Sequence, residues 1–115
     1  MYKIGEFSKI VNIPVRTLRY YDEFGILVPE ESDKYTGYRY YSDHNIEECN
    51  TIMLLKSLDF SLEEIKKYKD NLSSEVFENK KLELQGKINL MQLQCIELDK
   101  LSTSLKTNSY TKVLK

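Results

Sequence analysis

The sequence is poor in the residues on which many functional sites are built: it has no tryptophan, one histidine, two cysteines and four glycines. With His44 alone, the chain cannot assemble a Ser/His/Asp or Cys/His catalytic group. Cys49 and Cys95 lie far apart, and neither a disulfide framework nor a zinc site has that spacing. The scattered glycines form no phosphate-binding loop. We therefore expect no enzyme, metal or cofactor site, and we interpret both cysteines as apolar helix residues, with a redox or metal role as the alternative.

Long apolar runs are also missing, because none approaches the ~20 residues of a membrane span, and no signal-peptide pattern is present. We expect a cytoplasmic protein without membrane contact. The net charge is -1 in 115 residues, so any nucleic-acid role must come from local clustering of basic side chains. The length suits one small domain followed by a long helix.

The first 25 residues predict a helix-turn-helix. Phe7, Ile10 and Val11 have the spacing of one apolar helix face. Asn12 follows, and Asn tolerates the left-handed backbone of a tight turn. A second helix should begin near Pro14, which suits a first helical position, and end at Gly25, a good C-terminal cap.

The second predicted helix has two different sides at 100° per residue. The inner side comprises Val15, Leu18 and Tyr21, and the outer side Arg16, Arg19, Tyr20 and Glu23. Guanidinium groups bind phosphate oxygens and guanine edges in bidentate fashion, and a phenol hydroxyl can donate to phosphate. The alternative is a solvated face with a local Arg–Glu pair.

Residues 26–41 predict a small β hairpin. The stretch 26–30 is strand-like, and a turn is expected around Thr36 and Gly37. Tyr38 and Tyr40 then share one face, with Arg39 and Tyr41 on the other. Such a hairpin is a wing that can reach the DNA backbone; alternatively, its tyrosines cover the core.

Two further helices follow the hairpin. Ser42 is a good N-cap for the first, which should end near residues 57–60 with an apolar side formed by Ile46, Cys49, Ile52, Met53 and Leu55. Ser61 and Glu64 form a capping box for the second, with Leu62, Ile65 and Tyr68 inward. Lys56, near the end of the first helix, is well placed for a phosphate, although a charged helix residue is more often simply solvated.

A long helix is predicted from about Ser74 to Lys106, with an apolar seam whose members mostly alternate spacings of three and four. The seam consists of Phe77, Leu84, Ile88, Met91, Cys95, Leu98 and Leu105. A second apolar stripe, formed by Leu82, Leu93 and Ile96, lies roughly opposite. A helix that is apolar on two faces does not stand alone in water, so we predict a homodimer; the alternative is a terminal helix folded back on its own domain.

Three segments carry a resemblance to a known family: "TLRYYDEFGIL", "TGYRYYS" and "LDFSLEEI", in this order. With them, residues 2 to 70 resemble the DNA-binding domain of the mercury-resistance-regulator (MerR) family, closest to its multidrug-sensing branch. Ser8 stands where that family commonly has alanine, and Asn12 and Asp59 stand where it commonly has glycine. Asn and Asp tolerate the left-handed backbone, so the turns should be retained.

The resemblance implies a mainly α fold, a winged helix-turn-helix with a small β wing followed by a long coiled-coil dimerisation helix. The expected parts are a DNA-binding domain (1–72), the dimerisation helix (74–107) and a C-terminal tail (108–115). Carried over by position, the DNA-binding residues are Arg16, Thr17, Arg19, Tyr20, Tyr38, Arg39, Tyr40 and Lys56. We expect Arg16 or Thr17 at base edges and the others at phosphates. The dimerisation residues are Leu84, Ile88, Met91, Cys95, Leu98 and Leu105.

Family members bind promoters as antiparallel coiled-coil dimers and underwind a long spacer between the −35 and −10 elements, so RNA polymerase is an indirect partner. The tail "SYTKVLK" is similar to the first strand of a C-terminal multidrug-binding domain, and we expect such a domain beyond Lys115; a short regulator without its own sensor is the alternative. The sequence identifies no effector ligand, operator or sign of regulation. A coiled-coil adaptor that uses the helix-turn-helix as a scaffold is the alternative function, and it would show no DNA affinity above background.

Overall fold

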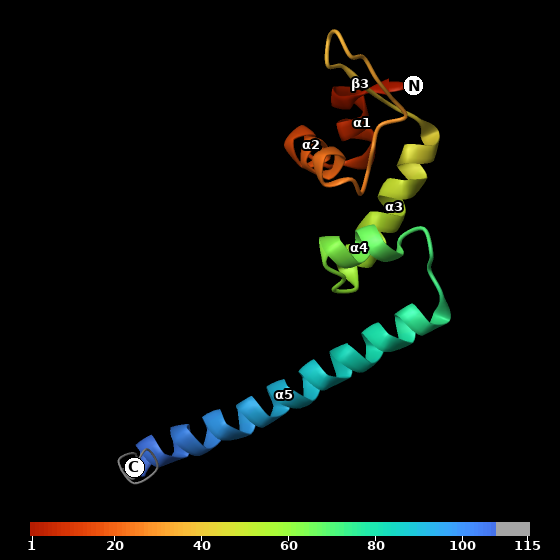
Figure 1. Cartoon of the computed structure of the whole chain (residues 1–115). Helices are drawn as coiled ribbons and strands as arrows, with labels where there is room; N and C mark the ends of the chain where they lie inside the picture. Colours follow the sequence, from red (N-terminus) through yellow and green to blue (C-terminus); the bar gives the residue numbers. More distant parts are fainter. Residues whose placement is uncertain (108–115) are drawn as a thin grey trace. The chain divides into compact units, whose positions relative to one another are not determined.

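The computed structural model describes residues 1–107, and the chain divides into two compact units that begin at Met1 and Ser73. The first unit ends at Leu72 and holds four helices and three short strands (Figure 1). The second is built on one long helix. The predicted fold class, mainly α with a small β wing and a long C-terminal helix, is confirmed.

A helix-turn-helix opens the first unit. Helix α1 (Ile4–Val11) ends at Asn12, whose left-handed φ of 56° reverses the chain, and helix α2 (Val15–Phe24) follows after Pro14. Gly25 caps α2 with a φ of 88°, a conformation that costs little only without a Cβ. The predicted turn at Asn12 and the predicted limits of the second helix are confirmed.

The turn between α1 and α2 is closed by side-chain and backbone hydrogen bonds. The Ser8 hydroxyl donates to the Ile13 carbonyl over 2.5 Å, and the Ile13 amide donates to the Ser8 carbonyl over 3.2 Å. Ser8, the departure from the family's usual alanine, therefore supports the turn.

The core lies where α1, α2 and α3 meet the sheet. Phe7, Leu18 and Tyr21 are buried, and Phe7 stacks on Tyr41 with ring centroids 4.3 Å apart. The prediction that Ile10 belongs to the core face of α1 is wrong, because its side chain is half exposed.

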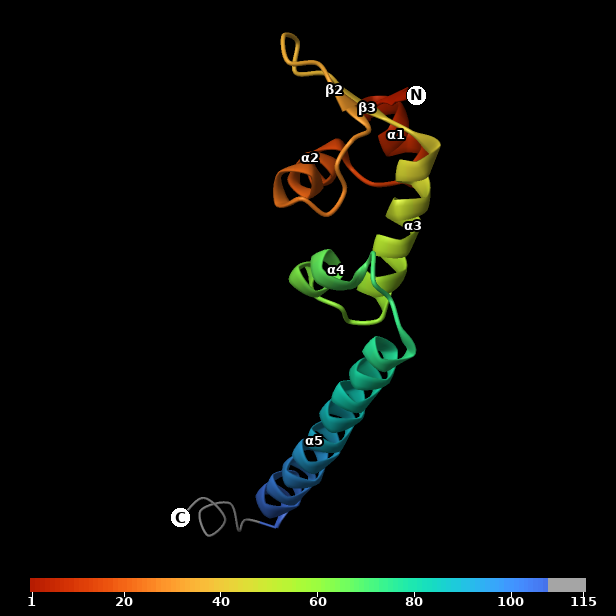
Figure 2. The same cartoon turned by 45° about the vertical axis from the view of Figure 1, so that its right-hand side comes forward.

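Three strands form one antiparallel sheet in the order β1-β3-β2. Strands β2 (Glu31–Ser32) and β3 (Arg39–Tyr41) form the predicted hairpin, and β1 (Tyr2–Lys3) pairs with the other edge of β3. The sheet thereby connects the wing to the residues that precede α1 (Figure 2).

The strand expected at residues 26–30 is absent. The amides of Ile26 and Leu27 instead donate to the Tyr21 carbonyl, continuing the C-terminal cap of α2, and both side chains are buried. The apolar run therefore reflects core burial at a helix end rather than strand pairing.

Helices α3 (Asp43–Ser57) and α4 (Leu62–Tyr68) complete the first unit. The capping hydroxyls of Ser42 and Ser61 each accept from the backbone amide three residues on, as predicted. The turn between α3 and α4 contains Asp59 with a φ of 68°, so the expected left-handed position is confirmed. On α3, Cys49, Ile52 and Leu55 are buried, whereas Met53 is exposed and its assignment to the apolar side is wrong.

Helix α5 (Ser74–Lys106) has the predicted limits and runs without interruption. Its leucines on both sides are largely exposed in the single chain; Leu93 and Leu98, for example, are each 64% accessible. The strand expected in the tail falls on residues 108–115, outside the described part of the chain. No helix among residues 1–107 is long and apolar enough to cross a membrane.

Candidate nucleic-acid interface

The outer side of α2 presents basic and aromatic side chains to solvent, as its helical spacing predicts. Arg16, Arg19 and Tyr20 are exposed, and Thr17 is half-buried. Tyr20 stacks on Phe24 one turn later, with ring centroids 5.9 Å apart. The stacking restrains the ring while its hydroxyl stays available for a hydrogen bond.

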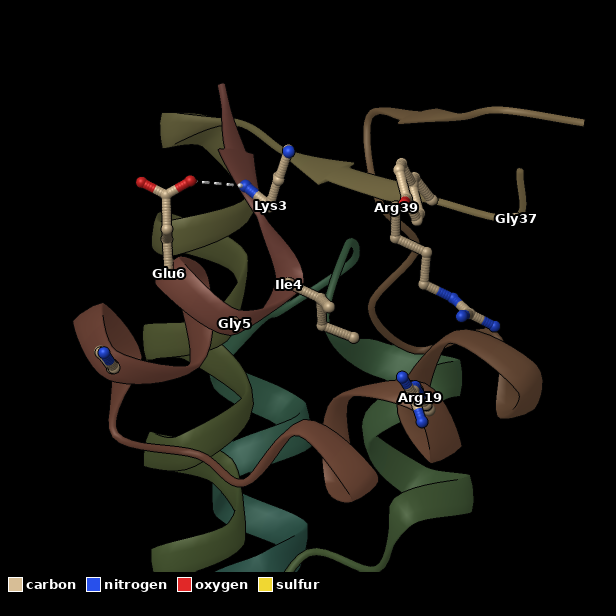
Figure 3. Close-up of a pocket in the computed structure, with 9 residues that line it drawn as sticks. Lys3, Ile4, Gly5, Glu6, Arg19, Gly37 and Arg39 are labelled. Atoms are coloured by element: carbon tan, nitrogen blue, oxygen red, sulfur yellow. Dashed lines mark hydrogen bonds between the residues drawn. The ribbon is translucent and has the colours of Figure 1, made fainter. Parts of the chain in front are cut away.

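A groove of about 590 Å³ lies between the start of α1, helix α2 and the wing (Figure 3). This volume is far larger than the ~30 Å³ share of one water, so a sugar-phosphate unit can enter it. Its charged lining residues are Lys3, Glu6, Lys9, Arg19 and Arg39. Four cations and one carboxylate give the groove a formal charge of +3, whereas the whole chain carries -1. Basic charge is thus concentrated locally, as a nucleic-acid role requires.

Arg39 is the best-anchored cation of the groove. Its Nε donates to Asp22 Oδ2 over 2.7 Å, linking strand β3 to helix α2. In Figure 3 the Arg39 side chain extends from the strand towards the α2 ribbon. The hydrogen bond with Asp22 raises the pKa of the guanidinium. The same bond restrains the orientation of the Arg39 side chain.

The wing tip is organised by a carboxylate. Asp33 Oδ1 accepts from the amides of Tyr35 and Thr36, and these two bonds lower the pKa of Asp33. Gly37, with a φ of 74°, then turns the chain back into β3. The turn expected around Thr36 and Gly37 is therefore confirmed.

Tyr38 lies at the groove, exposed, with the Lys3 ammonium 5.7 Å from its ring centroid. Cation–π contact of this kind restrains a lysine while leaving its N–H donors available. Tyr40 is half-buried, and Tyr41 belongs to the core. The expectation that tyrosines of the hairpin cover the core is confirmed for Tyr41, and the DNA contact of Tyr38 stays a prediction.

Lys56 lies apart from the groove. Its Nζ donates to the hydroxyl of Tyr21 over 3.1 Å and lies 5.8 Å from the centroid of that ring. The contact joins α3 to α2 and uses one of three ammonium donors. The other two N–H donors of the ammonium group can bind a phosphate, so the phosphate contact of Lys56 stays a prediction.

Sequence reasoning missed Lys3, Lys9 and Asp22. Lys3 precedes α1, and Lys9 lies in its last turn. Lys3 reaches the groove through the pairing of β1 with β3, a contact that carries no local signal. Asp22 did carry one: it follows Val15 by seven residues, and therefore lies on the inner side of α2. A carboxylate on that side requires a partner.

The predicted dimerisation residues lie along one side of α5. Leu84 is half-buried, and the other five, Ile88, Met91, Cys95, Leu98 and Leu105, are exposed. The opposite stripe of Leu82, Leu93 and Ile96 is exposed as well. Two such faces on one helix call for protein partners.

Within residues 1–107, no group of His, Cys, Asp or Glu side chains has the arrangement of a metal site. Cys49 is buried and Cys95 is exposed, and both are free thiols.

Comparison with known proteins gives consistent matches. Residues 2–72 match the family described as "MerR HTH family regulatory protein". The multidrug-efflux transporter 2 regulator of Bacillus subtilis is 43% identical over 101 residues, covering 83% of this chain and 36% of the relative. The multidrug-efflux transporter 1 regulator of the same organism is 41% identical over 76 residues, covering 66% of this chain and 27% of the relative. The chain thus spans about a third or less of these curated relatives.

Among solved structures, the crystal structure of MtaN, the N-terminus of a Bacillus subtilis multidrug transporter activator, superposes with a TM-score of 0.79 at 28% identity. The match covers 87% of this chain and 96% of that one. A second match, from a cryo-EM structure of an EcmrR–DNA complex, has a TM-score of 0.76 at 32% identity, covering 91% of this chain and 40% of that one.

Proposed function

The chain belongs to the MerR HTH family of regulatory proteins, and from this premise we propose that it binds double-stranded promoter DNA as a homodimer and regulates transcription. The observation that carries the proposal is the concentration of basic groups around α2 and the wing in a chain of net charge -1. The similar EcmrR structure, a complex with DNA, supports the same proposal.

In this proposal α2 enters the major groove. Arg16 and Thr17 lie in its first turn, where side chains of a recognition helix approach base edges. Arg16 suits a guanine, because a guanidinium fork matches its O6 and N7 acceptors. These two residues carry sequence preference.

The remaining predicted residues hold the DNA backbone. Arg19, Tyr38 and Arg39 line one groove, where a phosphate would meet several donors at once. Lys3 and Lys9 line the same groove and join this set. Tyr20, Tyr40 and Lys56 provide contacts outside it.

In this proposal the seam of α5 forms the dimer interface. Burying leucine-sized side chains against a second copy removes apolar surface from water, and symmetry duplicates every contact. Two copies of α2 then read two half-sites of a pseudo-palindromic operator.

The regulatory mechanism follows the family's use of DNA deformation. Bending and underwinding a long spacer realigns the −35 and −10 elements for RNA polymerase, which makes the polymerase an indirect partner. The cost of deformation depends on sequence and is offset by the phosphate contacts that the bend permits.

Selection of bound sequences from random duplexes tests the proposal. The unmodified chain should enrich a spaced inverted repeat. Arg16→Ala should weaken the base preference at one position in each half-site. No enrichment above background would contradict DNA recognition and favour the coiled-coil adaptor.

A further inference from the structure

Asp22 is an acidic residue in a place where DNA binding alone would disfavour one. It belongs to α2, the proposed recognition helix, next to a groove lined by four cations. Its side chain is only 21% exposed. A partly buried carboxylate beside a phosphate-binding surface costs desolvation and also repels the ligand.

The contact that Asp22 makes is specific. Its Oδ2 accepts from Arg39 Nε over 2.7 Å, between residues 17 positions apart on α2 and β3. Arginine has five N–H donors, and this bond occupies the Nε donor. The four N–H groups of the two Nη atoms remain for another acceptor in the groove that Arg39 lines.

Stability is a poor explanation for this pair. The cost of desolvating two charges largely offsets their attraction, so a partly buried ion pair adds little net stability. What it does fix is the orientation of a long side chain that otherwise samples many rotamers. An oriented Arg39 loses less entropy when DNA binds.

We propose that Asp22 is a positioning residue, which holds Arg39 of the wing against the recognition helix so that Arg39 and Arg19 meet the same stretch of DNA backbone. This inference rests on the proposed function. If charge alone mattered, removing the negative charge of Asp22 would strengthen DNA binding. The inference predicts that removing it weakens DNA binding.

The test is a double-mutant cycle, with affinity for a selected operator measured by fluorescence anisotropy. Asp22→Ala should weaken binding roughly three- to tenfold, the factor expected when one rotamer-rich side chain must be ordered on binding. In an Arg39→Ala background the same substitution should leave affinity unchanged or raise it, because the positioned group is gone. Asp22→Glu, which restores a carboxylate, should recover part of the loss.

Glu23→Ala is the matched control, because Glu23 is the next acidic residue on α2 and is exposed. It removes the same charge without breaking the hydrogen bond between Asp22 and Arg39, and it should leave affinity equal or higher. Circular dichroism melts of each variant establish that the helices remain folded.

Two results overturn the inference while leaving the proposed function intact. One is tighter binding of Asp22→Ala in both backgrounds, which would make Asp22 a repulsive charge only. The other is an equal loss in both backgrounds, which would make its role structural and independent of Arg39. Absence of DNA binding by the unmodified chain would overturn the inference together with the proposed function.

Discussion

Leu98→Asp tests the dimer at one position of the α5 seam. Leu98 is 64% exposed in the single chain, and in the proposed dimer that surface faces the partner helix. Complete burial of a leucine side chain contributes roughly 1.5–3 kcal/mol, so the exposed part contributes about 1–2 kcal/mol per copy. Symmetry doubles this to about 2–4 kcal/mol, which is roughly 30- to 1000-fold in the dissociation constant.

The aspartate adds a second cost, because each copy would bury a carboxylate without a partner. The first unit has its own core of residues such as Phe7, Leu18 and Ile52, and should remain folded. A monomer holds one half-site, so operator affinity should fall with association while the circular dichroism of the first unit is retained.

Sedimentation equilibrium measures the effect, and Leu93→Asp is the matched control. Leu93 is also 64% exposed and lies on the opposite stripe of the same helix, so the two variants differ in position rather than chemistry. Leu98→Asp should dissociate at concentrations where Leu93→Asp stays dimeric. If Leu93→Asp dissociates and Leu98→Asp stays dimeric, the interface is formed by Leu82, Leu93 and Ile96 instead. If the unmodified chain is monomeric at micromolar concentrations, the dimer is refuted.

Four further outcomes are expected. Arg16→Ala should cost about 1–3 kcal/mol at one operator position and relax base preference there; an unchanged preference in competition assays would move base readout elsewhere. Arg39→Ala should weaken all duplexes about equally and reduce the slope of log affinity against log salt by roughly one; unchanged affinity and slope would mean that the wing does not contact DNA. Burial raises the pKa of Cys49 to about 11, so its thiol stays protonated at neutral pH and should resist thiol reagents until the protein unfolds. Cys95, on the seam, should react slowly in the dimer and quickly in Leu98→Asp; rapid labelling of Cys49 in the folded chain would contradict its burial.

Local chemistry made much of the fold predictable. Asn12, Gly25 and Asp59 adopt the left-handed backbone, and Ser42 and Ser61 cap the helices expected to follow them. Each of these features depends on a few neighbouring residues, which is why sequence spacing was sufficient.

The errors arose where distant contacts decide the outcome. Residues 26–30 have strand-like composition, but Ile26 and Leu27 close the cap of α2 and enter the core. Ile10 and Met53 have apolar side chains at plausible spacing, yet both are exposed. Apolar character does not say which side of a helix the rest of the protein covers.

The residues of the candidate site were likewise predictable where local spacing places them and were missed where a long-range contact does. The exposure of Arg16, Arg19 and Tyr20 followed from the helical period of α2. The participation of Lys3 depends on the pairing of β1 with β3, and that of Asp22 on a hydrogen bond across 17 residues. The pairing of β1 with β3 has no local pattern. For Asp22, the helical period indicates that its carboxylate needs a partner, but it does not identify Arg39 as that partner.

Hydroxyl-radical footprinting on the selected operator tests the central claim most directly, that two copies of this chain hold one promoter site through α2 and the wing. The unmodified chain should protect two symmetric sets of backbone positions, one per half-site, and Arg39→Ala should lose the positions that the wing covers in both. A single protected set, or uniform protection without half-sites, would contradict the account.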